Sequence, residues 1–179
     1  RKGDKVNYPI ATDVVEHNAE AKAVWEAYRA GKPTRVPVMI STNERCTLKD
    51  PVYNPRGLQY DQVFGDPQLM LERQLEHQMW LRSQPWQDAE MGMPEEAWDT
   101  SPNFLNIYEA AWYGCPIVFI EDQIPDSEPI LSDEDSKKML FDQGIPDPFE
   151  SPFARQTWSA YEHFLARREE RWTWEGLPL

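Results

Sequence analysis

A short polar stretch that could bind a carboxylate follows the apolar run 35–41. Residues 42–45 read Thr-Asn-Glu-Arg. Arg45 could clamp a carboxylate by a bidentate pair, with Thr42 and Asn43 contacting the substrate beside it. An equally good alternative is an arginine that braces its own loop by pairing with a neighbouring carboxylate.

A second polar stretch follows the apolar run 116–120 and consists of Glu121 and Asp122. Two carboxylates at this position could serve as a general acid and base, or as oxygen ligands for a hard cation. The favoured alternative is an acidic pair that orders the loop or caps a helix. We retain Arg45, Glu121 and Asp122 as the candidate catalytic residues.

The histidines and cysteines give no metal site. Each histidine lies alone inside a predicted helix, with no second ligand at metal spacing, so zinc is unsupported. Cys46 follows Arg45, and a cation beside the thiol would favour its nucleophilic thiolate form. A small buried hydrophobic residue is the favoured interpretation of this cysteine. The histidines are His17, His77 and His163.

Helices and two short strands are predicted to position these groups. The apolar runs are too short for helices and are bounded by proline and polar residues, which indicates buried strands at 35–41 and 116–121. The stretch 41–65 has no clear period and is expected to be a long irregular loop, and 174–179 is typical of the approach to a further strand. Capping residues and apolar spacing predict helices at about 13–30, 66–85, 102–114, 132–144 and 151–171.

Strands buried on both faces and separated by helical crossovers indicate an α/β fold with a parallel sheet and helices outside it. A (β/α)₈ barrel typically takes roughly 250 residues, so a chain of 179 residues would be part of one. Polar residues that follow the strands would then lie at the catalytic end of the barrel. We expect one domain over residues 1–179, with residues 1–12 as a flexible arm.

Several motifs, in this order along the chain, resemble the uroporphyrinogen decarboxylase superfamily, which also contains corrinoid-linked methyltransferases. The resemblance covers most of residues 14–179 and implies the N-terminal half of a (β/α)₈ barrel. The motifs are Thr-Arg-Val-Pro-Val at 34–38, Phe-Gly-Asp-Pro-Gln-Leu-Met at 64–70, Tyr-Glu-Ala-Ala-Trp-Tyr-Gly at 108–114, Ile-Val-Phe-Ile-Glu-Asp at 117–122, Ile-Leu-Ser-Asp-Glu-Asp at 130–135, and Glu-Gly-Leu-Pro-Leu at 175–179.

Two departures from the family pattern bear on activity. True uroporphyrinogen decarboxylases carry two arginines after the first strand that hold substrate carboxylates, and here residues 39–45 retain only Arg45. Those enzymes also carry an aspartate just upstream of the turn that precedes the second strand. The corresponding stretch 104–107 offers Asn106 and no carboxylate, so the resemblance implies at most a substrate contact from this asparagine.

These departures favour a methyltransferase-type member that acts on a small metabolite with a corrinoid or thiol methyl carrier. One alternative is a true uroporphyrinogen decarboxylase, a lyase of porphyrin biosynthesis. Another is a non-catalytic assembly or binding subunit. We expect no cofactor in this chain, since a corrinoid or zinc would belong to the full-length parent, and we expect the chain alone to be inactive.

Charge and composition exclude several partners. The chain has 18 Lys and Arg against 31 Asp and Glu, a formal charge of −13. This acidity argues against binding to nucleic acid or to an anionic membrane, and no apolar run reaches the ~20 residues of a spanning helix. Two separated cysteines favour a reducing compartment, so a cytoplasmic location is expected. Open strand edges predict a homo-oligomer or a complementary C-terminal half barrel as partner.

Overall fold

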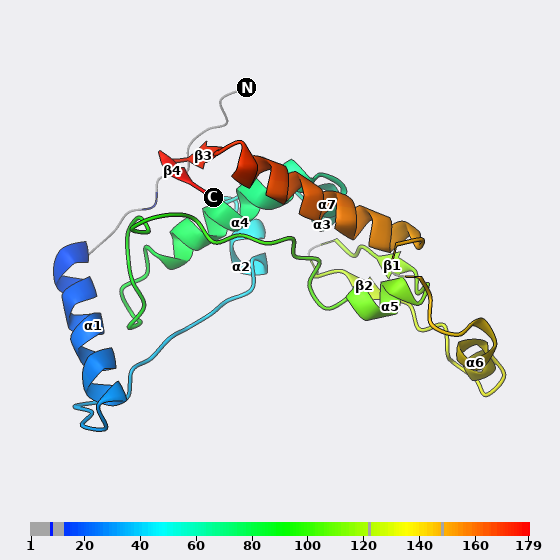
Figure 1. The fold of residues 1–179 in the computed structure, drawn as a ribbon, viewed down its shortest axis with the longest axis horizontal. Helices are drawn as coiled ribbons and strands as arrows, with labels where there is room; N and C mark the ends of the chain where they lie inside the picture. The colour runs from blue at the N-terminus through cyan, green and yellow to red at the C-terminus, as the bar shows by residue number, and fades with distance from the viewer. Residues whose placement is uncertain (1–7, 9–12, 122, 148) are drawn as a thin grey trace. The chain divides into compact units, whose positions relative to one another are not determined.

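The computed structural model describes residues 8, 13–121, 123–147 and 149–179, and its elements are labelled in Figure 1. By internal contacts the chain forms two compact units. Of the described residues, unit 1 comprises 8, 13–57, 73–99 and 173–179, and unit 2 comprises 58–72, 100–121, 123–147 and 149–172. Helix α4 (Pro67–Leu81) contributes its first six residues to unit 2 and the rest to unit 1. The expected single domain remains a prediction.

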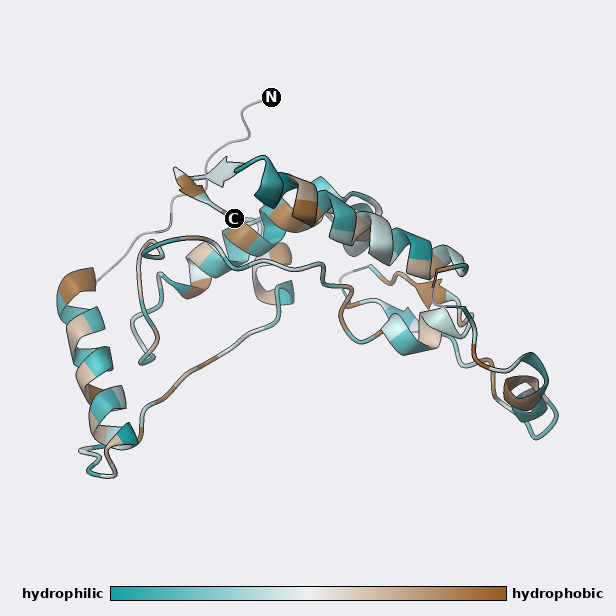
Figure 2. Cartoon of the chain, viewed as in Figure 1, coloured by the Kyte–Doolittle hydropathy of each residue, from teal (hydrophilic) through white to brown (hydrophobic). Residues whose placement is uncertain are grey.

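The first helix of unit 1, α1 (Val14–Arg29), begins where the sequence predicts. The Asp13 carboxylate accepts hydrogen bonds from the amides of Val15 and Glu16 at 2.8 and 3.0 Å, which satisfies two free donors of the first turn. Hydrophobic and hydrophilic bands alternate along α1 in Figure 2, and only Ala21 and Val24 are buried. Burial of so few apolar side chains leaves other interactions to hold the helix in place.

Side chains of α1 supply those interactions by bonding to the backbone of residues 88–91. Trp25 Nε1 donates to the Asp88 carbonyl at 2.8 Å, and His17 Nε2 donates to the Ala89 carbonyl at 3.0 Å. The Asn18 amide group both donates to the Met91 carbonyl and accepts from the Met91 amide, at 3.1 and 2.8 Å. This pairing satisfies both backbone groups of Met91, whose side chain is 1% exposed.

The prediction of a buried strand at 35–41 is wrong. Residues 36–40 belong to no strand or helix, and Val36 and Met39 are 69% and 67% exposed. Pro37 removes one donor that a strand would need. The neighbouring amides bond instead to side chains, Val38 to Asp88 at 2.7 Å and Ile40 to Gln87 at 3.1 Å.

The stretch 41–65, predicted to be irregular, contains two short helices, α2 (Arg45–Leu48) and α3 (Tyr60–Gly65). α3 begins with a capping box made by Gln59 and Gln62, whose side chains bond each other's backbone amides. Tyr60, Val63 and Phe64 on α3 are buried. α4 begins after Asp66 as predicted, because that carboxylate accepts from the amides at the helix start.

At the C-terminus of the chain, a hairpin belongs to unit 1. Strands β3 (Thr173–Trp174) and β4 (Leu177–Pro178) pair antiparallel. The two residues between them, Glu175 and Gly176, both have positive φ, which suits the tight turn of a twisted hairpin. The hairpin holds Trp98, whose backbone amide donates to the Pro178 carbonyl at 2.9 Å and whose indole donates to the Trp174 carbonyl at 3.1 Å.

Unit 2 is built around Phe104, which is 0% exposed. Its ring meets Phe64 of α3 edge-to-face at 5.1 Å, and Phe153 of α7 (Pro152–Glu169) edge-to-face at 5.3 Å. α7 begins at the predicted cap, since Ser151 Oγ accepts from the Ala154 amide at 3.0 Å. The remaining helical elements of unit 2 are α5 (Tyr108–Trp112), the 3₁₀ helix η1 (Ser136–Lys138) and α6 (Met139–Gln143).

The second predicted strand is present only as β1 (Ile117–Val118), which pairs antiparallel with β2 (Asp126–Ser127). Segments 35–41 and 116–121 belong to different units, so their expected parallel pairing stays a prediction. Among the described residues the sheets are two antiparallel pairs of strands. The half barrel remains a prediction from the sequence.

Candidate functional site

Three of the predicted site residues lie in one turn of unit 1. The Asn43 side chain accepts from the Arg45 amide at 2.9 Å, and the Asn43 carbonyl accepts from the Cys46 amide at 3.0 Å. Thr42 is half-buried, whereas Asn43 and Arg45 are exposed. Asn43 therefore orders the turn that starts α2 and places Arg45 at the surface. Cys46 is exposed, so its interpretation as a buried hydrophobic residue is wrong.

His77 of α4 fastens this turn to the helix. Its Nε2 donates to the Thr42 carbonyl at 3.0 Å, and its Nδ1 lies 3.1 Å from the hydroxyl oxygen of Thr47. The ring stacks on Trp80 at 5.7 Å and the residue is 6% exposed. Burial lowers the pKa of His77, against the opposing effect of the bond to Thr42. A neutral imidazole with its proton on Nε2 fits these contacts.

One turn before His77, Arg73 is buried in the same helix with 2% of its surface exposed. Its Nη1 donates to the Tyr53 carbonyl at 2.8 Å and also bonds the Glu76 carboxylate. Glu76 lies 3.6 Å from the guanidinium of Arg56 as well. Sequence reasoning did not identify Arg73. The available signal was its four-residue spacing from His77 on one helix face.

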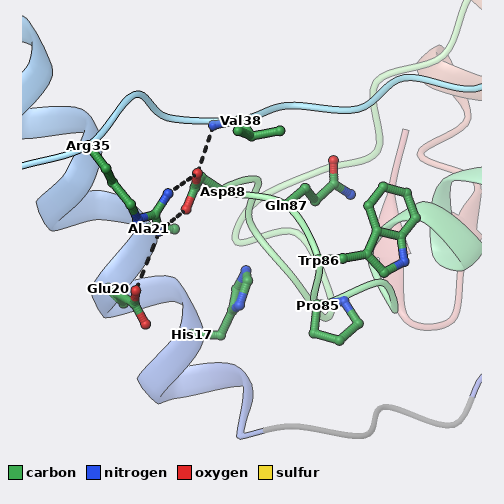
Figure 3. Close-up of a pocket in the computed structure, with 9 residues that line it drawn as sticks. All are labelled: His17, Glu20, Ala21, Arg35, Val38, Pro85, Trp86, Gln87 and Asp88. Atoms are coloured by element: carbon green, nitrogen blue, oxygen red, sulfur yellow. Dashed lines mark hydrogen bonds and ion pairs between the residues drawn. The ribbon is translucent and has the colours of Figure 1, made fainter.

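The pocket drawn in Figure 3 has a volume of about 300 Å³ and also belongs to unit 1. Arg35 points to Asp88 and Glu20 in this view, and its Nη1 donates to Asp88 at 2.6 Å. Asp88 also accepts from the Val38 amide, and hydrogen bonds from Arg35 hold the pKa of this carboxyl below its usual range. Because the charged groups of Arg35 and Asp88 already pair with each other, we interpret this pair as a structural contact that holds residues 35–38 in place.

The other predicted site residues belong to unit 2. Glu121 and Asn106 are both exposed, and Asp122 lies outside the described residues. The structure thus brings Thr42, Asn43 and Arg45 together in one turn. Their association with the candidates of unit 2 stays a prediction.

A second pocket, of about 440 Å³, lies within unit 2 and is mostly apolar. It is lined by Tyr113, Cys115, Leu131, Leu140 and Ile145. A pocket of this size and lining suits an apolar ligand more than a charged one. Neither Arg45 nor Glu121 lines it.

Among the residues that the structure describes, no three His, Cys, Asp or Glu side chains are grouped to hold a metal ion. In the same part of the chain, none of the helices combines the length and apolar character needed to cross a bilayer. In comparisons with known proteins, the chain matches no family model, no curated protein and no solved structure. The family resemblance therefore stays a prediction from the motifs.

The shifted pKa of His77 predicts a loss of stability in mild acid. The unfolded chain takes up a proton on this residue near pH 6.5, whereas burial lowers the pKa of His77 in the folded chain. Protons therefore favour unfolding, and stability should fall as the pH drops from about 7 towards the folded pKa. Urea unfolding at about pH 7, 6 and 5 should show this fall, with a smaller fall in the His77→Gln variant.

His163 contributes in the same direction, because burial and Arg167 also lower its pKa. The His77→Gln variant should therefore retain part of the pH dependence, and the matched variant His163→Gln should retain another part. Identical pH dependence in wild type and His77→Gln would contradict the prediction.

Proposed function

We propose that this chain is the N-terminal part of a protein of the uroporphyrinogen decarboxylase type that transfers a methyl group. The substrate is a small methylated or carboxylated metabolite, and the methyl carrier is a corrinoid or a thiol. The ordered motifs between residues 34 and 179 support the family. The retention of a single arginine in 39–45 supports methyl transfer ahead of porphyrinogen decarboxylation.

The observation that carries the proposal is the ordered turn from Thr42 to Arg45. His77 bonds the Thr42 carbonyl at 3.0 Å, and the Asn43 side chain bonds the Arg45 amide at 2.9 Å. A turn fixed at both of these points can present substrate contacts without a further cost of ordering the loop. Arg45 is the group that would hold a substrate carboxylate, and Thr42 and Asn43 are the adjoining polar groups.

The carrier supplies the nucleophile that accepts the methyl group, and none of the described residues is assigned to that step. The described residues lack a grouped donor set for a metal, so a zinc-bound thiol would depend on ligands from the parent protein. The part of this chain is to bind and orient the substrate. Acid–base work by Glu121 or Asp122 stays a prediction from the sequence.

The test compares two reactions of the full-length parent. The purified parent is incubated with methylated metabolites and a corrinoid or thiol carrier, and separately with uroporphyrinogen. We expect the appearance of methylated carrier and no efficient formation of coproporphyrinogen. In the Arg45→Gln variant the KM should rise about tenfold or more, in line with the loss of a charged hydrogen bond.

Efficient coproporphyrinogen formation would overturn the proposal in favour of a true decarboxylase. If neither reaction occurs, and the parent instead forms a stable complex with another subunit, the non-catalytic alternative is supported. A Lys49→Gln variant removes one exposed positive charge near the turn and should leave the KM unchanged.

A further inference from the structure

The guanidinium group of Arg73 has one edge with partners and one without. Nη1 donates to the Tyr53 carbonyl and to Glu76. The side chain is only 3% exposed, yet its buried Nε and Nη2 have no hydrogen-bond partner. Buried donors of a charged group are normally paired, because leaving them unpaired is costly. An occupant of the Nε–Nη2 edge would remove that cost.

The same part of unit 1 holds two further buried hydroxyl groups without partners, Tyr8 Oη and Thr42 Oγ1. Tyr8 stacks on Tyr53 with ring centroids 5.8 Å apart, and Tyr53 is the residue whose carbonyl Arg73 binds. Thr42 is held by His77, one helical turn from Arg73. Of the six buried side-chain atoms without partners among the described residues, four belong to these three side chains.

The local charge also favours an anion. Glu76 contacts both Arg73 and Arg56, so two guanidinium groups lie beside this carboxylate in a chain of net charge −13. Burial, and then Glu76, raise the pKa of Tyr8, so its phenol remains a hydrogen-bond donor at neutral pH. All four atoms can therefore donate, and an occupant must supply acceptors.

From this set of donors we infer that Arg73, Thr42 and Tyr8 form a binding site for the carboxylate of a small molecule. The Nε–Nη2 edge of a guanidinium matches the two oxygens of a carboxylate. The hydroxyl groups of Thr42 and Tyr8 supply the further donors. Tyr8 and Thr42 are half-buried, whereas Arg73 is buried.

This inference deepens the proposed function, since it assigns to Arg73 a substrate carboxylate that Arg45 alone would otherwise hold. Its test needs no methyl transfer, because it measures binding to the chain itself. Succinate binding without methyl transfer by the parent would leave the carboxylate site intact and remove only the proposed function. Methyl transfer without succinate binding would support the proposed function and overturn the carboxylate site.

The experiment is a calorimetric titration of the chain with succinate at low salt, with inorganic phosphate as a second probe. We expect saturable succinate binding with a Kd of about 1 mM or below, and weaker phosphate binding because a phosphate dianion costs more to remove from water than a single carboxylate group. Arg73→Gln should weaken succinate binding about tenfold or more. The control Arg29→Gln removes an equal charge from the exposed end of α1 and should leave the Kd unchanged.

Arg73→Gln removes a buried group, so circular dichroism must show that the variant folds. Thr42→Val and Tyr8→Phe each remove one hydroxyl and keep most of the side-chain volume, and each should raise the Kd about threefold to tenfold. The inference is overturned by the absence of saturable binding, or by equal losses in Arg73→Gln and Arg29→Gln. It is also overturned if both hydroxyl variants bind as wild type does, or if a crystal grown in succinate shows only a water on Nε and Nη2.

Discussion

Replacement of Phe104 by alanine is expected to lower the free energy of unfolding of unit 2 by about 4 kcal/mol, the range found for large aromatic residues truncated in a core. Phe104 is 0% exposed, and its ring meets Phe64, Tyr108 and Phe153 edge-to-face at 5.1, 5.7 and 5.3 Å. Truncation removes these contacts and leaves a cavity that the surrounding helices can fill only in part. Urea denaturation followed by near-ultraviolet circular dichroism measures the loss.

The matched control is Phe141→Ala in the same unit, because the side chain of Phe141 is 87% exposed. That change should alter the free energy of unfolding by less than about 0.5 kcal/mol. A loss below about 1 kcal/mol in Phe104→Ala would show that Phe104 is not the centre of the core of unit 2.

The helices with strong local signals were predictable from the sequence. The caps at Asp13, Asp66 and Ser151 each accept a hydrogen bond from the first turn of the following helix. Such a cap needs only residues two or three positions apart, so it can be read directly from the sequence. α3 was missed because its capping box uses Gln59 and Gln62 and lies in a stretch rich in proline and glycine.

Whether residues 35–41 form a strand could not be decided from their composition alone. β-branched residues favour an extended backbone, but residues 36–40 are assigned to no strand. Pairing into a sheet depends on a partner strand elsewhere in the chain. In unit 1 the groups that bond this segment come from Gln87 and Asp88, about 50 residues away: both side chains accept from its amides, and the Asp88 backbone amide donates to the Val38 carbonyl at 2.7 Å. No local pattern encodes that choice.

In the candidate site, too, the local features were predictable from the sequence and the long-range contacts were not. The turn from Thr42 to Arg45 depends on a short-range hydrogen bond from the Arg45 amide to the Asn43 side chain, and it directly follows an apolar run. The contacts that fasten this turn are long-range, because His77 reaches it from α4. The sequence analysis found no second metal ligand near His77, and the structure shows this residue hydrogen-bonded to Thr42 and Thr47. The unpartnered edge of Arg73 appears only when burial is known.

Replacement of Asp88 by alanine is expected to release the segment 35–40 from the loop that holds it. The Asp88 carboxylate accepts from both terminal nitrogens of Arg35 and from the Val38 amide. Removal of the carboxylate leaves the Val38 amide and the Arg35 guanidinium without these bonds, and charged hydrogen bonds are the strong ones. Hydrogen exchange at the Val38 amide should therefore accelerate about 30-fold, and limited proteolysis should cleave within 35–40.

The controls separate this bond from general loss of charge. Glu20 also contacts Arg35, at 3.4 Å, but its side chain is 71% exposed, so Glu20→Ala should change the Val38 exchange rate by less than about threefold. The Ile40 amide bonds Gln87 instead and should accelerate less than Val38 in Asp88→Ala. If Val38 and Ile40 accelerate equally in both variants, the segment is held by something other than Asp88. The hydrogen bonds of the Asp88 carboxylate would then not explain why the exposed apolar residues 36–40 stay in place.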